Sequence, residues 1–214
     1  IGRVPNIKSL KIENAGIKMS KRGVHIGDVD TQTSIPNIYA VGDVAGPYQF
    51  THFASHQAWY ASVNSLFSPF KKFKADYRVI PRTTFTDPEV ARVGLNEKEA
   101  LEKKIEYEVV NYDISELDRA IAEDEDRGFI KVLVSPGKDT VLGATIVGHH
   151  AGELITEFVT AMKHNFGLNK ILGTIHAYPT FSEANKSLAG NWKKSHAPEG
   201  ALKWLKRYHA WRRN

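Results

Sequence analysis

A tight hairpin followed by an amphipathic helix is the feature that most restricts the fold of this chain. Residues 129–134 and 141–147 are rich in β-branched and aromatic side chains, and the Ser-Pro-Gly-Lys-Asp stretch between them is a strong turn signal. Residues 153–166 then carry apolar side chains at helical spacing, with Gly167 as the expected stop. The pattern predicts an α+β fold, in which helices flank an antiparallel sheet.

A basic linker separates this region from the first part of the chain. Residues 67–76 contain a proline and several lysines without a sustained period, so we expect a domain boundary near residue 75. Before the boundary, the pattern predicts a short helix that ends near residues 14–16, strands over 23–30 and 38–41, and a helix over about 51–66. After it, we expect strands over 83–86, 90–95 and 107–114, and a helix over 96–104 with Asn96 as its N-cap.

Composition excludes several kinds of site. The chain has no cysteine, so disulfides, thiolate metal ligands and cysteine nucleophiles are excluded within its 214 residues. We also predict no metal site from the histidines, which include His25, His56, His149, His150 and His164. No stretch approaches the ~18–20 apolar residues of a membrane span, and we expect a cytoplasmic protein.

The charge of the chain is concentrated at its C-terminal end. The net charge is +5, and Lys203, Lys206, Arg207, Arg212 and Arg213 contribute much of the excess. Acids and bases are roughly balanced before this tail, so the sequence does not predict a nucleic-acid-binding protein.

A strand-like stretch at residues 38–41 runs directly into Gly42 and Asp43. One interpretation is local, because Gly-Asp is common turn chemistry. The other is functional, because ligands of α/β sheets often lie just beyond the C-terminal end of a strand. There, a glycine lets the ligand approach the backbone and an aspartate accepts hydrogen bonds from hydroxyl groups. These two residues alone leave both interpretations open.

Five stretches, in the same order along the chain, resemble motifs of the pyridine nucleotide–disulfide oxidoreductases, the family of glutathione reductase, dihydrolipoamide dehydrogenase and mercuric reductase. Residues 2–6 look like the exit from the NAD(P) domain, and residues 33–43 are similar to the second FAD-binding motif. Residues 50–54 look like the helix start beneath the flavin. Residues 85–94 resemble the first strands of the dimerisation domain, and residues 175–183 resemble the C-terminal active-site motif.

The resemblance implies roles for two groups of residues near the flavin. In this family the carboxylate after the Gly-Asp strand binds a ribityl hydroxyl of FAD, which makes Asp43 the candidate, with Gly42 leaving room for the cofactor. Thr51, His52 and Phe53 match the helix start, where backbone N–H groups and the positive end of the helix dipole would face the flavin. The side chain of His52 itself is expected to be structural.

The C-terminal motif departs from the family pattern at one position. Many members have a histidine directly before the proline, paired with a later glutamate, as a general acid–base for a redox-active thiol. Here that position is Tyr178, while Glu183 is retained. A phenol with an ordinary pKa near ~10 is a poor base at neutral pH, although it can donate a hydrogen bond. His176 is the alternative proton-transfer group, and Glu183 also fits a T-x-x-E capping box at the start of the next helix.

These observations predict the C-terminal part of a FAD-dependent NAD(P)H:disulfide, or metal-ion, oxidoreductase. Residues 1–75 would be the last portion of an α/β FAD-binding domain, residues 76–195 a dimerisation domain, and residues 196–214 a basic aromatic tail. The first FAD motif, the Cys-x4-Cys disulfide and the NAD(P) fingerprint are absent from the chain, so we expect it to be inactive alone. The resemblance also implies a homodimer, in which Tyr178 and Glu183 complete the partner's site.

Several alternatives stay open at this point. A non-catalytic dimerisation or scaffold module would need the second half of the chain but not Gly42 and Asp43. The tail is either a solvated terminal helix or an amphipathic helix at a membrane surface, which would associate the parent protein with a membrane. Tyr178 favours a mercuric-reductase-like member, but the electron acceptor and the choice of NADH or NADPH are undecided.

Overall fold

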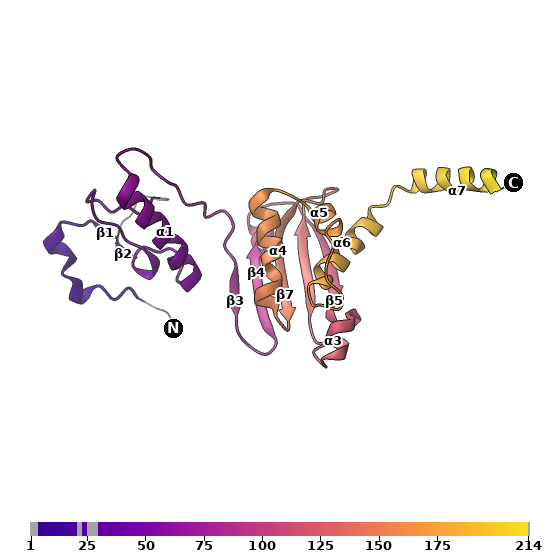
Figure 1. The fold of residues 1–214 in the computed structure, drawn as a ribbon, viewed down its shortest axis with the longest axis horizontal. Helices are drawn as coiled ribbons and strands as arrows, with labels where there is room; N and C mark the ends of the chain where they lie inside the picture. Colours follow the sequence, from indigo (N-terminus) through magenta and orange to yellow (C-terminus); the bar gives the residue numbers. More distant parts are fainter. Residues whose placement is uncertain (1–3, 21–22, 25–29, 214) are drawn as a thin grey trace. The chain divides into compact units, whose positions relative to one another are not determined.

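The computed structural model describes residues 4–20, 23–24 and 30–213. The chain divides into two compact units, Ile1–Arg78 and Val79–Asn214 (Figure 1). His25, most of the strand predicted over 23–30 and the start of the stretch at residues 2–6 lie outside the described residues. The predicted domain boundaries after residues 75 and 195 stay predictions about the parent protein.

The first unit contains one long helix and several short elements. The helix predicted over 51–66 is confirmed as α1, Thr51–Phe67. The short helix near residues 14–16 is confirmed as a 3-10 turn that ends at Gly16, whose backbone is left-handed with φ of 66°. The remaining elements of this unit are η1 (Lys8–Leu10), η2 (Ile12–Ala15), β1 (Met19–Ser20), β2 (Gly23–Val24) and η3 (Gly42–Val44).

The prediction of a strand over residues 38–41, all of which the structure describes, is wrong. This segment forms a single antiparallel bridge, between Gln32 and Tyr39. Two backbone bonds flank the bridge: Thr33 N donates to Ile38 O at 2.9 Å, and Ala40 N donates to Thr31 O at 3.0 Å. A strand inside a parallel sheet needs a neighbour on each side, and here the segment has one. The chain is nevertheless extended at Val41, just before Gly42.

The second unit is built on a five-stranded antiparallel sheet with the order β3-β4-β7-β6-β5. All neighbouring strands pair antiparallel, and β6 pairs with β7 through the predicted hairpin. Ser135 N donates to Thr140 O at 3.0 Å and closes the hairpin turn. The strands are β3 (Arg82–Thr84), β4 (Glu89–Gly94), β5 (Glu108–Asp113), β6 (Phe129–Val134) and β7 (Val141–Gly148).

Helices cover one face of this sheet (Figure 1). Helix α4 (Ala151–His164) lies against β4 and β7, and α6 (Glu183–Ser195) lies against β5 and β6. The predicted apolar face of α4 is confirmed, because Leu154, Ile155 and Phe158 are buried in the core. The observed α+β architecture is therefore the predicted one. The other helices of this unit are α2 (Glu97–Glu102), η4 (Ile114–Glu116), α3 (Asp118–Ala122), α5 (Leu168–Leu172) and α7 (Glu199–Arg213).

Two helix ends test the predicted capping residues. Asn96 is confirmed as the N-cap of α2, where it forms a full capping box with Glu99. The prediction that α4 stops at Gly167 is wrong: the helix ends at His164, and the next residue, Asn165, has a left-handed backbone with φ of 55°. Gly167 instead precedes α5, and a Cβ at this position would lie 2.3 Å from Cγ of Asp139. The glycine is required by the close approach of Asp139, whose carboxylate accepts a bond from Asn169 N.

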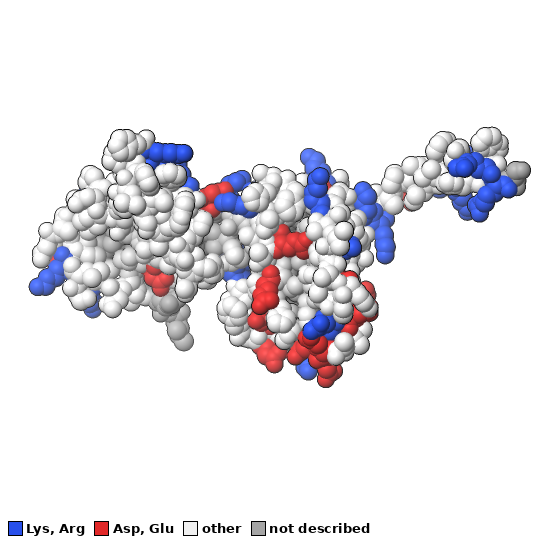
Figure 2. Space-filling view, in the orientation of Figure 1, with Lys and Arg blue, Asp and Glu red and all other residues white. Residues whose placement is uncertain are grey.

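Charged side chains are unevenly distributed over this unit. Figure 2 shows acidic side chains gathered around α3 and basic ones on α7. None of the described helices combines the length and the apolar character needed to cross a membrane.

Candidate functional site

The turn at Gly42 is fixed by its contact with α1. Gly42 is buried and adopts φ of 71°, a conformation that favours glycine. Its N–H donates to Oε1 of the buried Gln57 at 2.7 Å. A Cβ at residue 42 would lie 3.0 Å from Cβ of Ala54, so the small side chains on both sides allow the turn to lie against the helix. Asp43 follows directly, in η3, and is half-buried.

Helix α1 begins beside this turn without a side-chain cap. Its N-cap residue, Phe50, is extended and makes no side-chain cap hydrogen bond, and the first helical turn contains no acidic residue. The positive end of the helix is therefore not neutralised by a carboxylate of its own first turn. Thr51 and His52 are exposed at this end, whereas the side chain of Phe53 is buried against the rings of Tyr48 and Tyr77. Phe53 can thus reach a ligand only through its backbone.

These features fit a ligand with the chemistry of a flavin. A helix start rich in backbone N–H groups favours an electron-rich acceptor edge, and the carboxylate of Asp43 accepts hydrogen bonds from hydroxyl groups. The glycine lets the turn that carries Asp43 pack directly against Ala54 of α1, close to the helix start.

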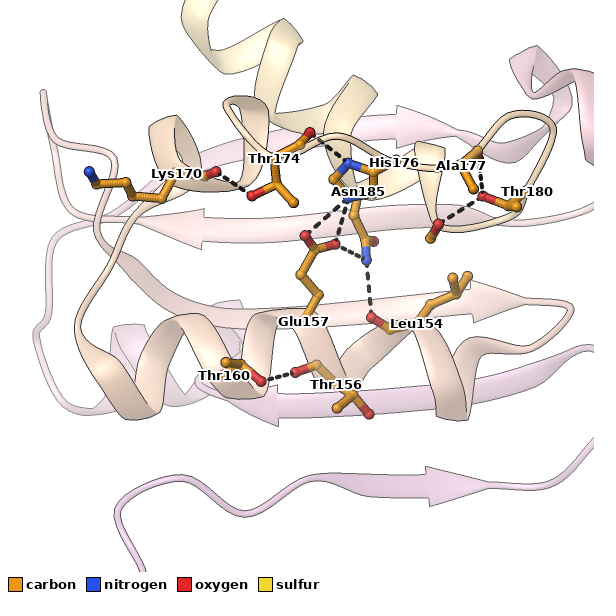
Figure 3. Close-up of polar contacts among 11 residues, drawn as sticks. Leu154, Thr156, Glu157, Thr160, Lys170, Thr174, His176, Ala177, Thr180 and Asn185 are labelled. Carbon is orange, nitrogen blue, oxygen red and sulfur yellow. Dashed lines mark hydrogen bonds and ion pairs between the residues drawn. The ribbon is translucent and has the colours of Figure 1, made fainter.

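The second group of candidate residues lies in the segment between α5 and α6. The side chain of His176 is only 6% exposed and points at α4 (Figure 3). Its Nε2 lies 3.0 Å from Oε1 and 3.2 Å from Oε2 of Glu157, and its Nδ1 lies 3.1 Å from the carbonyl oxygen of Thr174. A carboxylate and a carbonyl both accept hydrogen bonds, so the arrangement is fully satisfied when both ring nitrogens carry a proton.

Asn185 extends this contact to α6. Its Nδ2 donates to Oε2 of Glu157 at 3.0 Å and to the carbonyl oxygen of Leu154 at 3.0 Å (Figure 3). Asn185 is almost fully buried. The carboxylate of Glu157 therefore joins the segment that carries the motif to two helices, α4 and α6.

Tyr178 has the opposite environment. Its side chain is 70% exposed, and its hydroxyl donates to Oδ2 of Asp118, on α3, at 2.9 Å. The hydrogen bond to the Asp118 carboxylate raises the pKa of the Tyr178 phenol. The phenol is therefore a neutral hydrogen-bond donor at the pH values at which most proteins work, and not a base.

Glu183 has a local partner. Its Oε2 accepts a hydrogen bond from Thr180 N at 3.3 Å, which is half of the predicted capping box. The other half is not formed, because Glu183 N donates to the carbonyl oxygen of Thr180, at 3.3 Å, and not to its hydroxyl. The Thr180 hydroxyl donates to Ala177 O at 2.6 Å. Within the described residues, no hydrogen bond joins Glu183 to His176 or Tyr178. The glutamate that pairs with the histidine of this motif is Glu157.

A groove of about 410 Å³ opens beside this network, between α4 and the start of α6. Its lining combines polar side chains with the apolar side chains of Leu154 and Phe181, and the polar ones include Arg119, Glu153, Glu157, Thr180 and Asn185. In the described part of the chain, no group of three or more His, Asp or Glu side chains could hold a metal ion.

Three residues of this site were missed by the sequence-based prediction: Glu157, Asn185 and Asp118. Glu157 had a weak signal, since it is an acid directly before the buried Phe158, on a helix whose apolar residues form the core face. Asn185 and Asp118 gave no signal, because an asparagine on a helix and an aspartate at a helix start are common on protein surfaces.

Two family models match the chain. The one described as "Pyridine nucleotide-disulphide oxidoreductase, dimerisation domain" matches residues 80–189. The one described as "Pyridine nucleotide-disulphide oxidoreductase" matches residues 1–58.

Relatives and solved structures agree with these matches. The chain is 37% identical over 183 residues to a dihydrolipoyl dehydrogenase of Chlamydia trachomatis, a match that covers 86% of this chain and 39% of the relative. It is 39% identical over 184 residues to one of Vibrio cholerae, covering 86% and 38%. The chain thus spans less than half the length of these relatives.

Among solved structures, the HOCl-induced flavoprotein disulfide reductase RclA of Escherichia coli is similar. The TM-score is 0.78 at 29% identity, and the match covers 88% of this chain and 43% of RclA. A structure described as the Cu(II) complex of the same protein matches with a TM-score of 0.79 at 30% identity, covering 88% and 43%.

Proposed function

Because the chain belongs to the pyridine nucleotide–disulphide oxidoreductase family, we propose that it is the C-terminal part of a flavoenzyme that passes electrons from NAD(P)H to a disulfide substrate, which is reduced to the dithiol. The reported relatives that share this part are dihydrolipoyl dehydrogenases and a flavoprotein disulfide reductase. The NAD(P)H site and the redox-active dithiol would lie in the part of such an enzyme that these 214 residues do not include.

The first unit holds one side of the FAD in this proposal. Asp43 accepts a hydrogen bond from a hydroxyl of the ribityl chain, and Gly42 keeps side-chain bulk away from it. The backbone N–H groups of Thr51, His52 and Phe53, at the uncapped start of α1, face the electron-rich edge of the flavin ring. When bound, FAD supplies the two-electron chemistry that no side chain of this unit can perform.

The second unit supplies the dimer contact and the residue that meets the substrate. One observation carries this assignment: of the three candidate catalytic side chains, only Tyr178 is exposed, whereas His176 is buried and Glu183 bonds its own backbone segment. In a homodimer the exposed hydroxyl of Tyr178 would exchange its hydrogen bond to Asp118 for one donated to the thiol, thiolate or substrate at the partner's site. His176 and Glu183 are then positioning residues, which hold the segment in place.

A disulfide is favoured as the electron acceptor over a metal ion. A metal ion is supported by Tyr178 in place of the usual histidine, and by the description of one similar structure as a Cu(II) complex. The identities to dihydrolipoyl dehydrogenases extend through both units of the chain and carry more weight. We make no proposal of a mercuric reductase.

The experiment is a Tyr178→Phe substitution in the full-length parent enzyme. Flavin reduction by NAD(P)H, followed by stopped flow, should keep its rate, whereas steady-state turnover of the disulfide substrate should fall. Loss of one hydrogen bond to a reacting group costs roughly 1–3 kcal/mol, so turnover should fall roughly ten- to a hundredfold. Tyr107→Phe, at a tyrosine outside the motif, is the matched control.

Two outcomes would overturn the proposal. If both half-reactions of the Tyr178→Phe enzyme equal those of the wild type, Tyr178 only fills space. If the parent enzyme binds no flavin, the alternative of a non-catalytic dimerisation module is favoured, since such a module has no need of the Gly42–Asp43 turn.

A further inference from the structure

Helix α7, at the C-terminal end of the described chain, plays no part in the proposed reaction. All 15 of its residues, Glu199–Arg213, are exposed, and none is buried in a core. Trp204 is 63% exposed and Trp211 is 74% exposed, which is unusual for the largest apolar side chains. An isolated helix of this length is marginally stable in water, so α7 needs a partner surface.

The aromatic side chains of α7 form one continuous strip. Trp204, Tyr208 and Trp211 are spaced by four and three residues, which places them on one side of a helix. The rings of Trp204 and Tyr208 are stacked with centroids 5.6 Å apart, and those of Tyr208 and Trp211 are 6.2 Å apart. At 3.6 residues per turn, Leu205 lies on the flank of the same strip.

Basic side chains occupy the rest of the helix surface. Helical spacing puts Lys206 and Arg213 opposite the aromatic strip and Lys203 and Arg207 along its flank, and Figure 2 shows basic atoms gathered on this helix. The one acid of α7, Glu199, pairs with Lys203 at 3.6 Å. Arg212 lies at the edge of the aromatic strip, with its guanidinium 5.9 Å from the ring of Tyr208.

We propose that α7 binds the surface of an anionic lipid bilayer and lies in the plane of the headgroups. Trp and Tyr rings are amphipathic and are enriched at this boundary, and lysine and arginine on the other side attract anionic lipids. At 1.5 Å per residue the helix is about 22 Å long, too short for a hydrocarbon core of ~30 Å, so it lies on the bilayer and does not cross it.

The arrangement of the side chains favours a bilayer over a nucleic acid. Proteins that bind single strands combine a basic groove with aromatic rings that stack on the bases, so both kinds of side chain face the ligand. On α7 Lys206 and Arg213 face away from the aromatic strip, so they cannot contact the ligand that the strip contacts in a single narrow groove. A helix embedded at the headgroup level uses both sides at once.

The test is flotation of the full 214-residue chain with vesicles. We expect binding to vesicles with roughly 30% phosphatidylserine in phosphatidylcholine, and little binding to phosphatidylcholine alone. Raising the salt from about 0.05 M to about 0.5 M should weaken binding roughly tenfold, because the shorter Debye length screens the lysine and arginine charges. Flavin is not needed for this measurement, so its result is independent of the proposed enzymatic function.

Matched variants distinguish the contribution of the aromatic strip from that of the basic side chains. The Trp204→Ser/Trp211→Ser and Lys206→Gln/Arg207→Gln variants should each bind at least about tenfold more weakly, since they remove apolar area or roughly two charges. The controls are Trp59→Ser, at another exposed tryptophan, and Lys98→Gln/Lys104→Gln, at exposed lysines of the second unit; both should bind like the wild type. Because all altered residues of α7 are exposed, an unchanged thermal unfolding temperature should confirm that the variants fold.

Three outcomes would overturn the proposal. The first is a wild-type chain that floats with neither kind of vesicle. The second is tighter binding to a DNA duplex or single strand in the same buffer that survives the tryptophan substitutions. The third is a chain whose self-association, and not its vesicle binding, is lost when residues 199–214 are removed, which would assign α7 to a second copy.

Discussion

The pair of His176 and Glu157 joins the segment at residues 175–183 to helix α4. Both ring nitrogens of His176 face acceptors, and the single amide nitrogen of a glutamine cannot lie beside both of them, so His176→Gln leaves at least one acceptor without a donor. Leaving a largely buried polar group unpaired costs about 1–3 kcal/mol. The His176→Gln variant of the 214-residue chain should therefore lower the free energy of unfolding of the second unit by an amount in this range.

Measurement of this effect needs a probe that reports on the second unit alone. The chain contains four tryptophans, and Trp192 is the one buried in the core of this unit. In a Trp59→Phe/Trp204→Phe/Trp211→Phe background, Trp192 fluorescence follows denaturant unfolding there. His164→Gln, at an exposed histidine of α4, is the control. A double-mutant cycle of His176→Gln with Glu157→Gln should give a coupling energy, and additive effects would contradict the pairing.

The hydrogen bond between Tyr178 and Asp118 gives a prediction about pH. The carboxylate favours the protonated phenol, so Tyr178 should titrate above the ordinary range of tyrosine near pH 10. Because the folded-state pKa is raised, the stabilisation is fully present below the unfolded-state value and is lost as the pH rises through the folded-state value. Asp118→Asn keeps an acceptor but removes the charge, and should return the pKa toward the ordinary value.

The titration can be followed by NMR of the 13Cζ atoms of tyrosine, with the Tyr178 signal assigned from its absence in Tyr178→Phe. Glu123→Gln, at another exposed acid near α3, is the control and should leave the titration unchanged. An identical Tyr178 titration in the wild type and in Asp118→Asn would contradict the pairing with Asp118.

Among the elements, the start of α5 depends on a single glycine. Any side chain at residue 167 would overlap Asp139, whose carboxylate caps this helix through Asn169. Gly167→Ala should therefore lower the free energy of unfolding of the second unit by about 1–3 kcal/mol, as overpacking usually does. Gly173→Ala, at the other end of α5, meets its nearest atom at 3.4 Å in a right-handed backbone and should change stability little. Equal effects of the two substitutions, followed at Trp192, would contradict this account.

The same elements show why some features could be predicted from the sequence. The hairpin of β6 and β7 and the apolar face of α4 are patterns of neighbouring residues, and local patterns survive in any context. The strand expected at 38–41 failed because a strand also requires neighbouring strands, which lie elsewhere in a protein. The prediction of the end of α4 failed because Asn165 and Gly167 are both suitable residues for a helix stop. Only the contact with Asp139 shows that Gly167 is needed for close packing and not for ending α4.

Only part of the candidate site could be predicted from the sequence, for a related reason. The motif at residues 175–183 could be identified because its residues are consecutive. Its partners are not: Glu157 is 19 positions from His176, and Asp118 is 60 positions from Tyr178. Pairs this far apart are created by tertiary packing alone, so the sequence supplied the motif while its electrostatic environment came from the structure.

At the scale of the whole molecule, the two units divide the proposed work. The first carries the turn and helix start that would contact FAD, and the second carries the motif that would meet the substrate. The second unit matches the family's dimerisation domain over residues 80–189. This match, together with the exposure of Tyr178, makes self-association the property of the chain that is most directly testable.

The last prediction is that the 214-residue chain forms a dimer through this unit. Ile175 is 94% exposed and lies three residues before Tyr178 in the motif, so a partner that receives Tyr178 should also cover Ile175. Burial of a carboxylate in place of an apolar side chain is strongly unfavourable. Ile175→Glu should therefore raise the dissociation constant at least roughly tenfold, which corresponds to about 1.4 kcal/mol. Leu101→Glu, at an exposed leucine on α2, should leave dimerisation unchanged.

Sedimentation velocity over a concentration series measures both variants, and removal of residues 199–214 controls for association through α7. A wild-type chain that stays monomeric at about 0.1 mM would show that the contact requires the rest of the parent protein, and would contradict the prediction. Equal weakening by Ile175→Glu and Leu101→Glu would contradict it differently, because the effect would then come from added charge and not from an interface at the motif. Only a selective loss with Ile175→Glu places the dimer contact beside Tyr178, where the proposed reaction needs it.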